Sequence, residues 1–228
     1  MIKRFFSLIF VVLLALVFLP LVTEIKPLSE LGMTSAKYAE DGAAELGAAN
    51  LVTSVVVTYR GLDTLGEVTV LFITTAGIGF MLRRKTILPE KKRRASEILK
   101  SGTSFLLPLI ILFGVYIFVH GHLTPGGGFQ GGVVIASAIV LLMLSDINMH
   151  PDHNILNWLE SLSGAFYVIM GILGLILAGG FLDNRFLPLG EFGKIFSAGA
   201  IPVIYSLIGL KVGAELVGIL NKLGREDK

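Results

Sequence analysis

Long runs of apolar residues, separated by short polar stretches, make up most of the chain. Several runs are long enough to cross the hydrocarbon core of a bilayer, which takes roughly 17–25 helical residues. The pattern therefore predicts an all-α integral membrane protein with about seven transmembrane helices. The predicted spans are Phe5–Val22, Ala43–Tyr59, Glu67–Leu82, Thr103–His120, Phe129–Ser145, Ile155–Ala178 and Phe196–Leu220.

The N-terminal run from Phe5 to Val22 follows Lys3 and Arg4 and resembles a signal peptide. Its apolar stretch exceeds the roughly 7–15 residues of a signal core, and no clear small-x-small cleavage site follows it. We therefore predict a retained anchor helix. The mixed segment 23–42 after it predicts an amphipathic helix at the membrane surface, with Pro27 as its break.

A basic polar stretch from Arg83 to Ser101 divides the chain, and it carries eight Lys or Arg residues against two Glu residues. We predict three helices in residues 1–84, a basic linker over residues 85–102 and four helices in residues 103–228, a 3 + 4 arrangement. Because Lys and Arg near span ends are retained in the cytoplasm, we expect the linker and the C-terminus on the cytoplasmic side of the cell membrane. Seven spans then put the N-terminus outside, against the preference of Lys3 and Arg4.

Composition agrees with a membrane protein and excludes several kinds of site. Of 228 residues, 54% are hydrophobic and 16% charged, against about 45–50% and about 25% in soluble domains. The net charge of +2 gives no indication of nucleic-acid binding. The absence of cysteine excludes disulfides and thiolate metal sites, and no pair of the four histidines has the spacing of a helical zinc motif. We expect no catalytic residue, no bound metal and no bound cofactor.

Ionisable residues around the start of the third predicted span form a first candidate site. Asp63 and Glu67 are four residues apart, so a helix that begins at or before Asp63 places both on one face, with Thr74 further along it. Charged groups within a span cost about 2.5–3.5 kcal/mol each and usually face a bundle interior or a water path. The pattern favours a proton or cation relay, with Glu67 titrating, Asp63 beside it and Arg60 as a partner. The alternative is an interfacial Arg60–Asp63 ion pair that caps the helix start.

A glycine-rich connection joins the fourth and fifth predicted spans. Its notable residues are His120, His122, Pro125, Gly126, Gly127, Gly128, Gln130 and Gly131. The Gly-x-Gly-x-x-Gly pattern within it is no dinucleotide fingerprint, because the fingerprint requires a preceding strand. Proline and successive glycines indicate an irregular, tightly packed connection, which we interpret as a rigid subunit-contact loop. A direct proton relay through the two histidines, which titrate near neutral pH, is the alternative.

A second charged pair lies within the last predicted span. Lys211 and Glu215 are four residues apart and can pair, which lowers the cost of placing either in lipid. Two interpretations are open: part of an ion route between helices, or a mutually neutralising pair near the cytoplasmic end. Gly209 and Gly213 beside the pair are typical of close helix packing.

Two of these regions resemble parts of a known family. The stretch from Asn50 to Val70, with its Arg-Gly-x-Asp-Thr-x-Gly-Glu core, resembles the C-terminal region of the large A-type subunit of Mrp-type sodium/proton antiporters. The stretch from His120 to Gly132, with its Pro-Gly-Gly-Gly-Phe-Gln-Gly signature, resembles the B-type subunit of the same antiporters. A short piece of the A-type subunit joined directly to the B-type subunit is similar to modules of archaeal membrane-bound hydrogenase and sulfane reductase complexes, which are related to complex I.

The resemblance implies a non-catalytic membrane subunit of a multisubunit, Mrp-like respiratory complex that translocates Na⁺ and H⁺. Both ions would be transported rather than held as cofactors. The implied partners are other membrane subunits and the lipid bilayer, without nucleic acid. Glu67 and Asp63 match the family's acidic motif. The residues we expect in the ion path are Glu67, Asp63, Arg60, Thr74, Lys211 and Glu215. The alternative is a scaffold subunit with no direct part in ion conduction.

Overall fold

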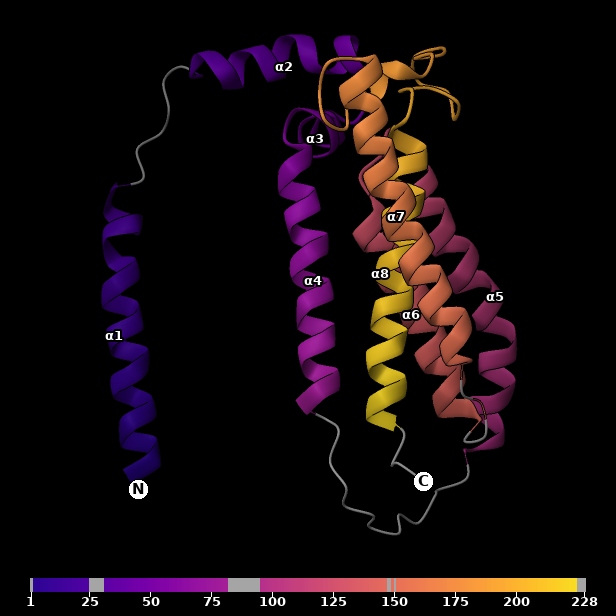
Figure 1. Cartoon of the computed structure of the whole chain (residues 1–228). Coiled ribbons are helices and arrows are strands. Elements are labelled where there is room, and N and C mark those ends of the chain that lie inside the picture. The colour runs from indigo at the N-terminus through magenta and orange to yellow at the C-terminus, as the bar shows by residue number, and fades with distance from the viewer. Residues whose placement is uncertain (1, 25–30, 82–94, 147–148, 150, 225–228) are drawn as a thin grey trace. The chain divides into compact units, whose positions relative to one another are not determined.

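The structure, a computed structural model, describes residues 2–24, 31–81, 95–146, 149 and 151–224, which form helices and connecting loops without a strand. Two compact units can be distinguished, Met1–Ala36 and Lys37–Lys228. The first contains α1 (Ile2–Glu24) and the start of α2 (Met33–Leu46). The second contains the rest of α2 and α3 (Leu51–Thr53), the π-helix η1 (Ser54–Tyr59), α4 (Gly61–Met81), α5 (Glu97–Val119), α6 (Gly128–Ser145), α7 (His153–Leu177), the 3₁₀-helix η2 (Asn184–Phe186) and α8 (Ile201–Gly224) (Figure 1).

Within the part of the chain that the structure describes, five helices are long and apolar enough to cross a membrane, namely α4, α5, α6, α7 and α8. In addition, α1 carries a shorter apolar stretch, Arg4–Pro20. The predicted all-α class and the multi-pass membrane character are therefore confirmed. The predicted 3 + 4 count is not confirmed, because one of the seven predicted spans is not a single helix.

That span is Ala43–Tyr59. Helix α2 ends at Leu46, and the next residue, Gly47, has a φ of +67°, a conformation that favours glycine. A new helix then begins at Leu51, with Asn50 as its N-cap, whose side chain accepts a hydrogen bond from the backbone. The segment is apolar, but it consists of a helix end, a turn and the short elements α3 and η1. The amphipathic helix predicted between residues 23 and 42 corresponds to α2, whereas Pro27 lies outside the described residues.

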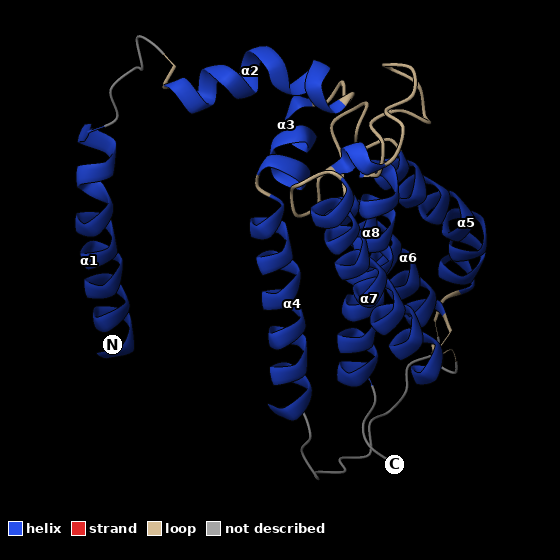
Figure 2. Cartoon of the chain, turned by 45° about the horizontal axis from the view of Figure 1, so that its top comes forward, coloured by secondary structure: helices blue, strands red, loops and turns tan. Residues whose placement is uncertain are grey.

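Helix α8 is the centre of the second unit, because it packs against α4, α5, α6 and α7 (Figures 1 and 2). Its buried apolar side chains include Ile201, Ile204, Ile208, Val212 and Val217. The helix begins at Ile201 instead of the predicted Phe196. Ala198 and Gly199 have φ values of 62° and 55°, which a right-handed helix cannot include.

The loops at the two ends of α4–α8 separate clearly (Figure 1). Residues 47–60, 120–127 and 178–200 gather at one end, called here the loop end. There, Arg185 pairs with Glu45 at 3.1 Å and with Asp183 at 2.6 Å, and so joins α2 to the η2 segment. At the other end lie the end of α4, the start of α5, the end of α6, the start of α7 and the end of α8.

Residues 37–81 belong to the same compact unit as α5–α8. The division of the chain by contacts thus falls at Ala36 and not in the predicted linker. Of that linker, residues 85–94 lie outside the described residues, and α5 already begins at Glu97. The predicted division into residues 1–84, 85–102 and 103–228, which rests on sequence resemblance, stays a prediction.

Candidate functional site

An ion pair between Lys211 and Glu215 lies inside the helix bundle. Lys211 Nζ donates to Glu215 Oε1 at 2.6 Å, and the two side chains are 10% and 0% exposed. Because α8 begins at Ile201 and ends at Gly224, the pair is near the middle of the helix and not near its C-terminal end, where the sequence placed it. Lys211 Nζ also lies 5.1 Å from the centroid of the Phe72 ring on α4, a cation–π contact. The second oxygen of Glu215, Oε2, is buried and has no hydrogen-bond partner among the described residues.

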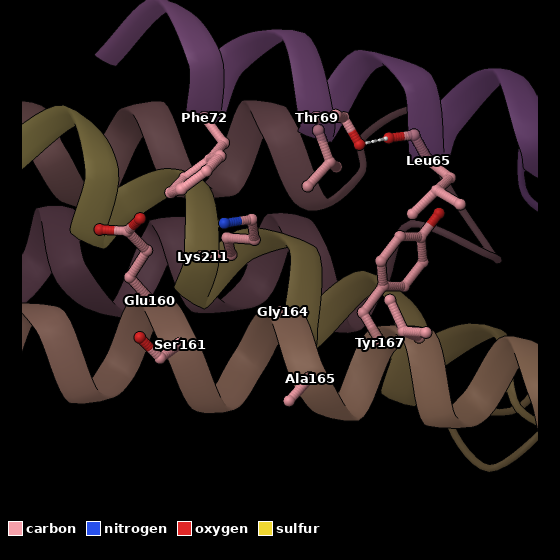
Figure 3. Close-up of a pocket in the computed structure, with 11 residues that line it drawn as sticks. Leu65, Thr69, Phe72, Glu160, Ser161, Gly164, Ala165, Tyr167 and Lys211 are labelled. Carbon is pink, nitrogen blue, oxygen red and sulfur yellow. Dashed lines mark hydrogen bonds between the residues drawn. The ribbon is translucent and has the colours of Figure 1, made fainter. Parts of the chain in front are cut away.

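Lys211 forms part of the wall of a pocket of about 300 Å³ between α4, α7 and α8 (Figure 3). Apolar groups dominate the wall. Its polar residues are Thr69 of α4, Glu160, Ser161 and Tyr167 of α7, and Lys211 of α8. A mostly apolar pocket with a few convergent polar groups and a buried charge pair is the usual form of a binding or conduction site in a bundle.

The predicted acidic residues lie on α4. Since α4 begins at Gly61, Asp63 and Glu67 are one turn apart on the same helix, as the spacing predicts. Glu67 is exposed and makes no hydrogen bond or ion pair with the residues that the structure describes. Glu67 therefore stands at the border between the bundle and its surroundings.

Arg60 and Asp63 form an ion pair at the start of α4, with side chains 63% and 52% exposed. This geometry favours the alternative interpretation, an ion pair that caps the helix start. Thr74 is exposed too, and its hydroxyl donates to the Val70 carbonyl one turn back at 2.8 Å. None of these three residues lines the pocket beside Lys211.

The glycine-rich connection folds onto its own chain at the loop end. Asn50 Nδ2 donates to the Gly121 carbonyl at 2.8 Å, and the Asn50 backbone N–H donates to the His122 carbonyl at 2.9 Å. Thr53 Oγ1 donates to the Gly121 carbonyl at 2.6 Å and lies 3.1 Å from the Tyr205 hydroxyl. The region that resembles the large A-type subunit thus contacts the region that resembles the B-type subunit through buried polar groups.

The prediction of a subunit-contact loop requires correction for the buried members of that loop. His122, Gly127, Gly128 and Gly131 are buried within the chain. A Cβ atom on Gly128 would lie 2.6 Å from Ile208 of α8, so the glycine is needed for packing inside the chain. The other members, His120, Pro125, Gly126 and Gln130, are exposed or half-buried. Contact between these four and another protein of the complex stays a prediction.

His122 is buried at the loop end, and the proton relay considered as an alternative stays untested. Its ring Nε2 lies 3.2 Å from the Lys194 carbonyl, and its side chain is fully buried. Burial lowers the pKa of His122 below its usual value. Burial therefore favours the neutral form of the imidazole.

Sequence reasoning missed Glu160, Tyr167 and Tyr205. From hydropathy alone, Trp158 and Glu160 are typical of residues at the membrane interface. Which residues of α7 face α8 cannot be predicted from a single sequence. The detectable signal was a tyrosine in the middle of an apolar span, since a buried phenol hydroxyl usually has a polar partner. In the described part of the chain, no group of three or more His, Asp or Glu side chains could hold a metal ion.

Two family models match the chain. A domain related to the MnhB subunit of Na⁺/H⁺ antiporters matches residues 98–218. The chain belongs to this family. The model for the E subunit of MBH matches residues 8–96, so the two matches meet close to the start of α5.

Two proteins with similar sequences illustrate the extent of the similarity. Protein MJ1307 of Methanocaldococcus jannaschii is 32% identical over 194 residues, which is 73% of this chain and 74% of that protein. The B-type subunit of the Na⁺/H⁺ antiporter of Bacillus subtilis is 48% identical over 48 residues, which is 21% of this chain and 34% of that protein. The similarity to this bacterial antiporter subunit is therefore restricted to a short segment of both proteins.

Two solved structures share the fold. A chain in the structure of the membrane-bound sulfane sulfur reductase, an archaeal respiratory membrane complex, is 41% identical, with a TM-score of 0.84 over 100% of both chains. A chain in the Mrp complex from Dietzia sp. DQ12-45-1b is 23% identical, with a TM-score of 0.78, and covers 99% of this chain but 26% of that one. The resemblance found in the sequence is therefore confirmed, and the second likeness shows the fold alone.

Proposed function

We propose that this chain is a membrane subunit of a multisubunit Mrp-like respiratory complex that translocates Na⁺ and H⁺, and that it contributes to the ion path. The chain itself catalyses no reaction in this proposal, and its partners are other membrane subunits. Support comes from the match over the full chain to a chain in an archaeal respiratory membrane complex and from membership of a family related to one subunit of the antiporters.

The observation that carries the ion-path role is the buried Lys211–Glu215 pair beside the pocket. A buried ion pair is weak evidence for stability, because apolar residues of similar volume are often as stable. Ionisable residues in the middle of a span usually mark an ion or proton route. We therefore place the pair in the path, with Glu67 at its border, and assign to Arg60 and Asp63 an ion pair that caps the start of α4.

Replacement of Glu67 by glutamine tests the role of α4. Glu67→Gln removes the charge but keeps the shape, so we expect it to abolish Na⁺-dependent ion transport while the complex still assembles. The measurement is transport by the purified native complex in liposomes, with subunit composition checked on the same preparation. Glu97→Gln is the matched control, because the Glu97 side chain is 88% exposed at the start of α5. A scaffold role predicts that both variants transport at the wild-type rate, and that result would refute this role for Glu67.

The orientation of the N-terminus follows from the revised span count. If α1, with its shorter apolar stretch Arg4–Pro20, crosses the membrane like the five spanning helices, the chain has six crossings, and both termini lie on the same side. The basic stretch 83–101 then fixes that side as cytoplasmic. In contrast to seven spans, six crossings also put Lys3 and Arg4 in the cytoplasm, which removes the conflict with the positive-inside preference. We therefore propose cytoplasmic N- and C-termini.

Thiol labelling distinguishes the two orientations, because the chain has no cysteine of its own. With six crossings, Ser35→Cys on α2 lies outside the cell, and a membrane-impermeant thiol reagent is expected to label it in intact cells. With seven spans, the same position is cytoplasmic and stays unlabelled. Ser96→Cys is the control, since it is cytoplasmic in both orientations and should react only after the membrane is opened.

A further inference from the structure

Helix α4 is packed on one side and exposed on the other. It packs mainly against α8 and η1, and its buried residues recur at helical spacing, namely Gly61, Thr64, Val68 and Thr75. On the opposite side, the Val70 and Ile73 side chains are each 63% exposed. We call this surface the outer face of α4, and its residues are Gly66, Glu67, Val70, Ile73, Thr74 and Gly77. Because α4 is long and apolar enough to span the membrane, this face meets either lipid or another protein.

Glu67 favours protein over lipid as the neighbour of this face. It is the seventh of the 21 residues of α4, so it lies about 9 Å along the helix from its start. Its carboxylate makes no hydrogen bond or ion pair within the part of the chain that the structure describes. Charged groups inside the bilayer are costly and usually pair with another charge. Arg60, the nearest basic residue along the chain, is already paired with Asp63, so the missing cation has to come from elsewhere.

Two glycines on the same face do not serve the packing of the chain itself. Gly66 and Gly77 are about three turns apart, so they lie one above the other along the helix. A Cβ atom added at either position would meet no atom within 4 Å. Glycine weakens a helix relative to alanine, and small residues let the backbones of neighbouring membrane helices approach closely. The two glycines therefore suit close contact with a helix from outside the chain.

We propose that the outer face of α4 binds a membrane-spanning helix of another subunit, which presents a Lys or Arg side chain to Glu67 and apolar side chains to Gly66 and Gly77. Helix α1 of the same chain does not meet this description, because it contains no Lys or Arg from Phe5 to Glu24. A chain 41% identical to this one over its full length belongs to a respiratory membrane complex. The inference rests on assembly into such a complex, as proposed above, but not on the ion-path role.

Photo-crosslinking in the purified native complex tests which molecule covers the face. With the photoreactive residue p-benzoylphenylalanine in place of Ile73, irradiation is expected to join this chain to another subunit. Peptide mass spectrometry is expected to place the attachment in an apolar, membrane-spanning segment that carries Lys or Arg. Adducts with lipid alone, with α1, or with a segment that lacks Lys and Arg would each overturn the proposal.

Charge reversal at Glu67 tests the ion pair between the subunits. Glu67→Lys would place two cations against each other, so we expect the yield of co-purifying partner subunit to fall several-fold. Glu67→Gln keeps a hydrogen-bond acceptor for the basic side chain, so this variant is expected to assemble. Glu97→Lys is the matched control, because it makes the same change on a side chain that is 88% exposed at the start of α5. Assembly of Glu67→Lys with the wild-type yield would refute the pairing.

Gly77→Leu tests the close approach of the two helices. The purified chain is expected to keep at least the wild-type free energy of unfolding, because no atom lies near an added Cβ, whereas the complex is expected to dissociate. Gly102→Leu on α5 is the matched control, since an added Cβ there also meets no atom within 4 Å, and its complex should stay intact. An intact complex in Gly77→Leu, or a destabilised purified chain, contradicts the proposed contact.

Failure of this inference is distinguishable from failure of the proposed function. Lipid-only adducts at position 73 in a complex whose transport depends on Glu67 would refute the docking surface alone. A native preparation in which the chain co-purifies with no other subunit would refute the proposed function, and the docking surface with it.

Discussion

Lys211→Met is expected to destabilise the chain by about 3–5 kcal/mol, because it leaves the carboxylate of Glu215 buried without its partner. The two side chains are 10% and 0% exposed, so solvent screens the pair little. Methionine keeps most of the volume of lysine and leaves the contact with Phe72 apolar. The measurement is the free energy of unfolding of the purified chain in detergent, compared with the wild type.

The double variant Lys211→Met/Glu215→Leu separates stability from transport. Removing both charges replaces the pair by apolar groups, so the free energy of unfolding is expected to return to near the wild-type value. The change in this free energy in the double variant, minus the sum of the changes in Lys211→Met and Glu215→Leu, measures the coupling between the two side chains. If the pair conducts ions, transport by the complex stays lost in this stable double variant. Recovery of transport together with stability would show that the pair only holds the bundle together, as the scaffold alternative requires.

The sequence predicted the helical class and six of the seven helices with bounds that differ by up to six residues, because a long apolar run indicates a helix that crosses the bilayer. It failed at Ala43–Tyr59. This segment is apolar as a lipid-facing helix is, but Asn50 and Thr53 within it bind the Gly121 carbonyl of the glycine-rich loop. Hydropathy does not distinguish burial in protein from burial in lipid. The available signal was Asn50, a strong N-cap in the middle of the run.

The candidate site was predictable only in part. The ion pair between Lys211 and Glu215 was predicted from their spacing, because residues four positions apart are neighbours on the surface of one helix. The pocket beside the pair depends on how α7 and α4 turn toward α8, so Tyr167 and Glu160 could not be assigned. For the same reason Glu67 was predicted in the bundle interior, whereas the fold of the single chain places it at the border. The glycine-rich loop was recognised as tightly packed, but its packing partners lie within the chain.

Gly131→Ala tests whether that glycine serves the chain itself or a neighbouring protein of the complex. An added Cβ atom at this position would lie 2.6 Å from the Gly114 carbonyl oxygen of α5. This oxygen belongs to the helix backbone, so it cannot relieve the clash by a change of rotamer. Overpacking of this kind costs about 1–3 kcal/mol, and it outweighs the roughly 0.8–1.0 kcal/mol by which alanine exceeds glycine in helix propensity. We therefore expect a lower free energy of unfolding for the purified chain on its own.

Gly218→Ala is the matched control for this variant, because the same added Cβ on α8 meets no atom within 4 Å. It gains the helix propensity without the clash, so the chain is expected to be as stable as the wild type or more stable. The opposite sign of the two effects for one chemical change identifies close approach of α5 and α6 as the cause. An isolated Gly131→Ala chain with wild-type stability, in a complex that nevertheless dissociates, would instead return this glycine to a contact between subunits.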